Sequence, residues 1–88
     1  MRSMNDMLDD KTGTRYIAIN VQQKRLDRGW SQSELARRAQ LNSMFISTLE
    51  SGTVQPGAVR LKRIADALDT SCDQLMAQPS ARLLEIAS

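Results

Sequence analysis

The sequence predicts an all-α fold: a compact bundle of five helices, followed by a short sixth helix at the C-terminal end. Three observations predict it. Apolar residues recur every three or four positions in successive segments, serine, threonine or asparagine precedes most of these segments, and glycine follows some of them. A chain of 88 residues with 41% hydrophobic side chains allows one small domain, whose core is marginal but workable at this size.

We expect three parts along the chain. Residues 1–13 are polar, with several acidic side chains, and are expected to form a flexible N-terminal tail. Residues 14–78 are expected to form the helical domain. Residues 79–88 are expected to form the short C-terminal helix.

The first helix of the domain is expected to begin after Thr14, which can cap it. It runs to about Arg28, and Ile17 and Val21 share the face that points toward the core. Gly29 is typical of the residue that ends a helix. The sequence therefore predicts a first helix of about four turns.

Residues 31–52 predict two short helices that are joined by a tight turn. Ser31 can cap the first of them, and Glu34 completes a capping box three residues later. Asn42 can cap the second helix, and Gly52 is a plausible left-handed stop. Each helix has one apolar stripe, formed by Leu35, Ala36 and Ala39 in the first and by Phe45, Ile46 and Leu49 in the second.

The opposite face of the second short helix carries small polar side chains and one methionine. Hydroxyl groups and an apolar tip are side chains that can reach base edges in the major groove of duplex DNA. Such residues can also simply solvate a surface helix, but the helix that precedes them favours DNA binding. The residues on this face are Ser43, Met44, Ser47 and Thr48.

Two more helices complete the predicted bundle. Pro56 and Gly57 start the fourth helix. Ser71 and Gln74 resemble a second capping box, which opens a short fifth helix that ends at Met76. The apolar face of the fourth helix consists of Leu61, Ile64, Ala65 and Leu68.

An ordered set of residues spans all five predicted helices. Its members are Arg25, Gly29, Ser31, Gln32, Glu34, Leu35, Ala36, Ala39, Leu41, Asn42, Ile46, Ser47, Leu49, Glu50, Gly52, Pro56, Leu61, Ile64, Ala65, Ala67, Leu68, Ser71 and Leu75. With this set, the chain from about Ile17 to Met76 resembles the small helix-turn-helix DNA-binding domains of phage repressor and Cro proteins, the Xre-like family. The resemblance implies a lambda-repressor-like fold and a sequence-specific regulator of transcription that binds double-stranded DNA.

The same resemblance implies roles for individual residues. The residues implied to face bases are Ser43, Met44, Ser47 and Thr48. The residues implied to contact phosphates are Ser31, Gln32, Asn42, Thr53, Val54 and Gln55. Arg25 and Glu50 match a pair that forms a structural salt bridge between the first and third helices.

Three features depart from the family pattern. Gln40 stands where the turn usually has glycine, which would cost on the order of 1 kcal/mol if Gln40 has a positive φ. Asp69 likewise replaces the usual glycine after the fourth helix. The base-facing set lacks Arg, Gln and Asn, so we expect modest direct discrimination of bases and a larger part for DNA shape.

The apolar residues at the C-terminal end need a partner surface. They could fold back on their own bundle or extend an interface between two copies of the chain, and we favour the homodimer. A symmetric dimer places two recognition helices about one DNA turn apart and requires a roughly palindromic operator. The expected dimer interface consists of Leu75, Leu83, Leu84 and Ile86.

Charge, cysteine content and targeting signals exclude several classes of function. A formal net charge of +2 does not by itself indicate DNA, and we interpret the basic cluster of Arg60, Lys62 and Arg63 as a solvated face. One cysteine, no histidine and no acidic cluster with ligand spacing predict no metal and no cofactor. No nucleophile lies near a general base, so we expect no enzyme. Without a membrane-spanning or signal segment, we expect a cytoplasmic protein.

Three functions follow from these observations. The leading one is a stand-alone regulator of the repressor or controller type. The second is an antitoxin of a toxin–antitoxin pair, with a toxin or other protein as partner, which also represses its own operon. The third is a module that binds only proteins, and weak salt dependence of DNA binding would favour it.

Overall fold

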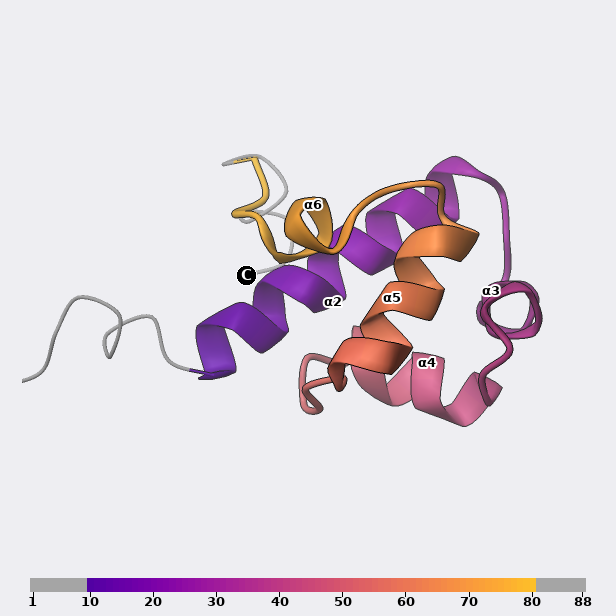
Figure 1. Cartoon of the computed structure of the whole chain (residues 1–88), viewed down its shortest axis with the longest axis horizontal. Helices are drawn as coiled ribbons and strands as arrows, with labels where there is room; N and C mark the ends of the chain where they lie inside the picture. Colours follow the sequence, from indigo (N-terminus) through magenta and orange to yellow (C-terminus); the bar gives the residue numbers. More distant parts are fainter. Residues whose placement is uncertain (1–9, 81–88) are drawn as a thin grey trace, which may run out of the picture.

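The structure is a computed structural model, and it describes residues 10–80 (Figure 1). Five helices account for most of these residues. They are α2 (Asp10–Asp27), α3 (Gln32–Ala39), α4 (Ser43–Glu50), α5 (Ala58–Ala67) and α6 (Cys72–Met76). These residues include no β-strand, so the predicted all-α class is confirmed. The tail predicted for residues 1–9 and the helix predicted from residue 81 onward lie outside the described residues.

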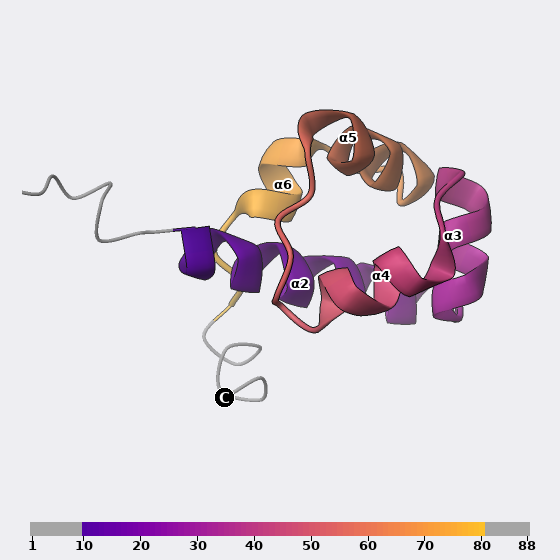
Figure 2. The same cartoon turned by 90° about the horizontal axis from the view of Figure 1, so that it is seen from below.

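The helices surround a single core. In Figure 2, α2 and α4 lie along one side of the bundle and α5 lies along the opposite side. α3 closes one end, where it packs against α4 and α5, and α6 closes the other end, where it packs against α2 and α5. This arrangement leaves one face of α4 on the outside of the molecule.

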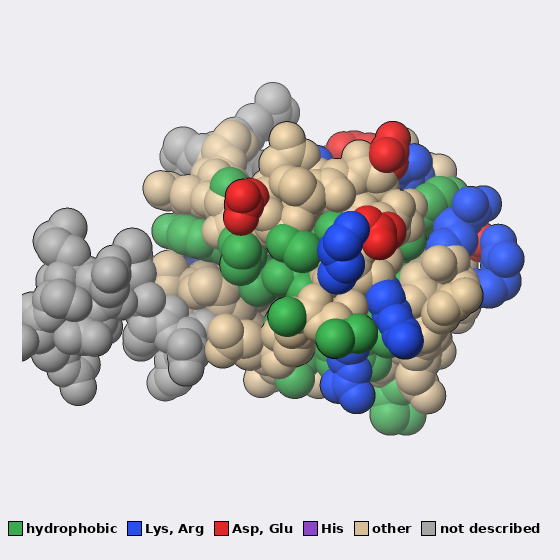
Figure 3. Space-filling view, in the orientation of Figure 1, with side chains coloured by type: hydrophobic (Ala, Val, Ile, Leu, Met, Phe, Trp, Pro, Cys, Tyr) green, Lys and Arg blue, Asp and Glu red, His purple; other side chains and the backbone are tan. Residues whose placement is uncertain are grey.

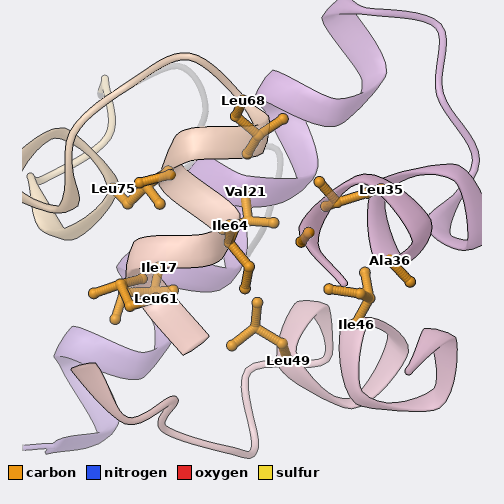
Figure 4. Close-up of a cluster of buried hydrophobic side chains, with 12 residues drawn as sticks. Ile17, Val21, Leu35, Ala36, Ile46, Leu49, Leu61, Ile64, Leu68 and Leu75 are labelled. Carbon is orange, nitrogen blue, oxygen red and sulfur yellow. The ribbon is translucent and has the colours of Figure 1, made fainter. Parts of the chain in front are cut away.

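The core between these helices takes side chains from all five of them (Figure 4). Val21, Leu35 and Ile64 point toward one another and are fully buried. Burying an aliphatic side chain of this size contributes about 1.5–3 kcal/mol. Trp30 is half-buried and packs against the cluster.

α2 begins earlier than the sequence predicts. The expected N-cap, Thr14, lies inside the helix, which starts at Asp10. Thr14 is only 6% exposed, because it occupies the buried face one turn before Ile17 and Ala18. The prediction that residues 10–13 belong to the tail is therefore wrong: the buried face of the helix extends one turn further than the capping residue indicated.

Serine side chains cap α3 and α6 as predicted. The Oγ atom of Ser31 accepts from the Glu34 N–H at 3.0 Å, and the Oγ atom of Ser71 accepts from the Gln74 N–H at 3.1 Å. In a capping box, the side chain three residues after the cap accepts a second hydrogen bond from the backbone N–H of the capping residue. In both predicted boxes that side chain has other partners. The Glu34 carboxylate pairs with two arginines of its own helix, and the Gln74 side-chain oxygen accepts from the Thr70 hydroxyl.

Three helices end in the same left-handed turn. The residue after α3, Gln40, has φ 58°, and the N–H of Leu41 donates back to the Ala36 carbonyl at 2.8 Å. Gly29 and Asp69, each two residues after the end of α2 and α5, have φ 71° and 55°, and the residue that follows each of them donates back in the same way. Each turn satisfies helix carbonyls that would otherwise lack a partner. The two non-glycine positions therefore keep the turn geometry despite the strain of a positive φ.

The burial of Leu75 corrects one predicted site. Leu75 is fully buried and belongs to the core, so its expected role as a dimer contact is wrong. Asn20 of α2 holds this part of α6 in place, since its side-chain amide donates to the Leu75 carbonyl at 2.8 Å and to the Ala77 carbonyl at 2.7 Å. The other expected dimer residues, Leu83, Leu84 and Ile86, lie outside the described residues.

Candidate nucleic-acid interface

The start of α4 is fixed by Asn42. Its Oδ1 atom accepts from the Met44 N–H at 2.7 Å, and its backbone is extended, with φ −78° and ψ 138°. The cap stabilises a helix of only eight residues by about 1 kcal/mol. The positive end of the helix dipole therefore lies at Asn42, where the resemblance implies a phosphate.

The four residues predicted to face bases lie on one exposed face of α4. Met44 is 75% exposed, and Ser43, Ser47 and Thr48 are also exposed. The other side of the helix is anchored in the core by Ile46 and Leu49, which are fully buried. The structure therefore brings these four residues together, with the helix held firmly behind them.

Thr48 differs from the other three in what it can offer. Its hydroxyl donates to the Met44 carbonyl at 2.9 Å, a bond to the preceding turn of the same helix. The hydroxyl proton is engaged in this bond, so Thr48 can offer a methyl group and acceptor lone pairs. The sequence alone did not indicate this bond, although threonine four residues after a helical carbonyl commonly forms it.

A polar network joins α4 to α2 and α3. The guanidinium of Arg25 donates to both carboxylate oxygens of Glu50, at 2.7 and 2.9 Å. The side-chain amide of Gln32 donates to Glu50 Oε1 at 3.2 Å. Both side chains of the ion pair are buried, with 9% of Arg25 and 3% of Glu50 exposed. This network fixes the start of α3 relative to the end of α4.

The structure places the residues predicted to contact phosphates around both ends of α4. Ser31 and Gln32 lie at the start of α3, and Asn42 lies at the start of α4. Thr53 and Gln55 are exposed in the loop after α4. Val54 in the same loop is half-buried against the core, so only its main chain is suited to a phosphate.

Hydroxyl groups hold this loop against the end of α4. Ser51 Oγ donates to the Thr48 carbonyl at 2.5 Å and lies 2.7 Å from Thr53 Oγ1. Gly52, between them, has φ 80°, a conformation that suits glycine. Sequence reasoning did not identify Ser51, although a serine hydroxyl commonly donates to a backbone carbonyl three or four residues earlier.

Two groups of charged side chains on the surface form ion pairs. The hydrogen bond from Arg37, together with Arg38, lowers the pKa of Glu34. The hydrogen bond with Asp66 raises the pKa of Lys62. Among residues 10–80, no three histidine, cysteine or acidic side chains are grouped as metal ligands would be. Within the same range, no helix has the length and apolar character that crossing a bilayer requires.

Comparisons with known proteins agree with this geometry. A model of the helix-turn-helix family matches residues 21–75. The chain is similar to a protein of Neisseria meningitidis serogroup B that is described as a Neisseria hypothetical transcription factor, with 30% identity over 78 residues that cover 89% of this chain and 74% of that protein. The crystal structure of the hypothetical transcription factor NHTF from Neisseria matches with a TM-score of 0.75, 30% identity and 88% of each chain covered. The chain therefore belongs to the Xre/Cro-like helix-turn-helix family of DNA-binding transcription regulators.

Proposed function

We propose that this chain is a sequence-specific regulator of the repressor or controller type, which binds a roughly palindromic operator as a homodimer. The observation that carries this proposal is the exposed face of α4, whose three small hydroxyl side chains and one methionine lie opposite its buried anchors. A helix presented in this way fits the major groove, where base edges are distinguishable. α4 is therefore proposed to be the recognition helix.

The proposed contacts divide into two kinds. Ser43, Met44, Ser47 and Thr48 are proposed to meet base edges. Ser31, Gln32, Asn42, Thr53 and Gln55 are proposed to contact phosphates through their side chains, and Val54 through its main chain. Because phosphate contacts fix the register and base contacts specify the sequence, the two kinds respond differently to mutation.

The small surface that one copy of the domain can bury on DNA supports the proposed dimer. A recognition helix of eight residues contacts only a few base pairs, and a single small module buries about 600–1,000 Å² on DNA. Two copies related by a two-fold axis double this surface. At the C-terminal end of the described residues, Met76 is 45% exposed, and the apolar residues predicted to form the dimer interface follow it in sequence.

The test of this function is selection from a random duplex library by the purified protein at physiological salt, followed by sequencing of the bound DNA. We expect enrichment of an inverted repeat whose half-sites are about 34–36 Å apart, one helical turn of DNA. Enrichment of a single half-site would contradict the dimer. Absence of any enrichment would contradict sequence-specific binding.

Substitutions test the assignment of α4 as the recognition helix. We expect Ser47→Ala and Thr48→Ala to change which bases are enriched. Gln32→Ala is expected to weaken binding to all sequences alike. If both α4 variants enrich the same sequence as the unmodified protein, a different face of the domain enters the groove.

A further inference from the structure

One arginine beside α4 stacks on an aromatic ring, unlike the other two basic residues of its helix, Lys62 and Arg63. Arg60 lies in the first turn of α5, and its guanidinium carbon is 4.8 Å from the centre of the Phe45 ring on α4. Lys62 pairs with Asp66 at 2.6 Å, whereas Arg60 forms no ion pair with any residue from 10 to 80. Its charge is therefore held in place without being neutralised there.

The position of Phe45 determines where this charge lies. On an ideal helix, Phe45 is about 60° around the axis from Thr48, on the flank of the base-facing side. The opposite flank of α4 carries Glu50, which binds Gln32. Figure 3 shows lysine and arginine side chains gathered over α5 and α3 on this side of the molecule. Arg60 thus adds a cation to one flank of the proposed recognition helix, and Gln32 lies on the other.

We propose that Arg60 binds a backbone phosphate of the operator on this flank, and that the Phe45 ring holds its guanidinium ready. The inference rests on the proposed function, in which α4 enters the major groove. A helix about 10–12 Å across fills a groove about 12 Å wide, so each flank of α4 faces one sugar-phosphate backbone. A guanidinium can bind a phosphate through two parallel hydrogen bonds.

Stacking on Phe45 favours this role. A free arginine side chain loses rotamer freedom when it binds, and a side chain that is already ordered loses less. The ring also attracts the cation through its face, while the donor groups at the edge of the guanidinium remain available. Phe45 therefore acts as a positioning residue for Arg60.

The first experiment compares Arg60→Gln with the matched control Lys62→Gln on the operator selected by the unmodified protein. Both variants remove one positive charge from α5, so long-range electrostatics are equal. We expect Arg60→Gln to reduce the magnitude of the slope of log affinity against log salt by about 1.8, the value for two phosphates, because the proposed dimer carries two copies of Arg60. Its affinity deficit should shrink about 12-fold between about 50 and 200 mM salt. The Lys62→Gln slope should match that of the unmodified protein.

The second experiment tests the positioning role of Phe45. Phe45→Leu keeps an apolar side chain against the core but removes the ring. We expect Phe45→Leu to weaken binding, and we expect Arg60→Gln to have a smaller effect in that background than alone. Equal effects of Arg60→Gln in both backgrounds would overturn the role of the ring. Unfolding by denaturant shows that each variant is folded before binding is compared.

The outcomes separate this inference from the proposed function. If the unmodified protein binds duplex DNA without salt dependence, the proposed function fails. If it binds with salt dependence but Arg60→Gln behaves like Lys62→Gln, only the phosphate contact fails. A changed base preference in Arg60→Gln would overturn the phosphate assignment, because it would show a contact to a base. A changed solution mass would overturn it by placing Arg60 between two copies of the chain.

Discussion

Glu50 connects three helices through its two carboxylate oxygens. It belongs to α4 and accepts hydrogen bonds from Arg25 of α2 and from Gln32 of α3. Arg25 also donates to the Trp30 carbonyl at 2.7 Å, so the arginine has partners on both sides. Removing one member of such a pair leaves the other charge buried, and that loss exceeds the net contribution of the intact pair.

We predict that Glu50→Ala lowers the free energy of unfolding by about 3–5 kcal/mol, because the buried guanidinium of Arg25 loses its counter-charge. The control is Glu34→Ala, which breaks an exposed cluster on α3 and should lower the free energy of unfolding far less. Denaturant unfolding monitored by circular dichroism measures both. Equal losses for the two variants would mean that the Glu50 network is as weak as a surface ion pair.

The concentration dependence of stability can show whether Leu75 is buried within one copy of the chain or between two copies. We predict that Leu75→Ala lowers the free energy of unfolding by about 2–5 kcal/mol, as expected for truncation in a core. The loss should be the same over a wide range of protein concentrations. The neighbouring control Met76→Ala, at an exposed position, should cost far less. A loss at Leu75 that grows on dilution would restore it to a dimer interface.

The sequence predicted side-chain positions better than side-chain partners. The exposed set of α4 followed from helical periodicity, because Ile46 and Leu49 define its buried side. The bond of the Thr48 hydroxyl and the stacking of Arg60 on Phe45 depend on rotamers and on contacts between helices, which periodicity does not contain. Leu75 was recognisable as apolar, but the pattern could not tell which surface would cover it.

At the scale of elements, local signals predicted the short helices well. The bounds of α3, α4 and α6 follow from caps whose hydrogen bonds span two or three residues. The start of α2 was wrong because Thr14 looks like a cap, yet packing against the rest of the bundle buries it. Local capping signals do not contain that tertiary contact.

The turn between α3 and α4 allows a test of backbone strain. Gln40 has φ 58°, where a residue with a Cβ atom pays on the order of 1–2 kcal/mol and glycine does not. Replacing Gln40 by glycine removes this strain. Part of the gain in stability is lost, because glycine raises the conformational entropy of the unfolded chain, which costs about 0.4–1 kcal/mol. We predict that Gln40→Gly raises the free energy of unfolding by about 0.5 kcal/mol or slightly more, measured by denaturant unfolding.

The matched control for this turn is Gln40→Ala. Alanine also has a Cβ atom, so it keeps the strain and removes only the polar side chain. Its stability should stay close to that of the unmodified protein or fall below it. If alanine and glycine stabilise equally, the gain comes from losing the glutamine side chain and the strain at this turn is negligible.

At the scale of the whole molecule, both the all-α fold class and membership of the helix-turn-helix family could be predicted from the sequence. The residues that carried the resemblance include core positions of α3, α4, α5 and α6 and the buried Arg25 of α2, so they specify how the helices pack as well as where they lie. The association of two copies of the chain could not be predicted from the apolar pattern in the same way. A single copy buries Leu75 completely, so the described residues contribute less to the proposed dimer than the sequence pattern indicated.

The proposed dimer therefore depends on the apolar residues that follow the described domain. We predict that Leu83→Asp weakens both dimerisation and operator binding, because a carboxylate in an apolar interface must be desolvated without a partner. The control Gln78→Asp adds the same charge at an exposed position five residues earlier.

Light scattering measures the mass, and duplex titration at the same protein concentrations measures the affinity. Because a palindrome binds two linked domains more tightly than two separate ones, the two losses should occur together. An unchanged mass with unchanged affinity would exclude Leu83 from the interface, and reduced affinity at unchanged mass would place it on the DNA-binding side instead.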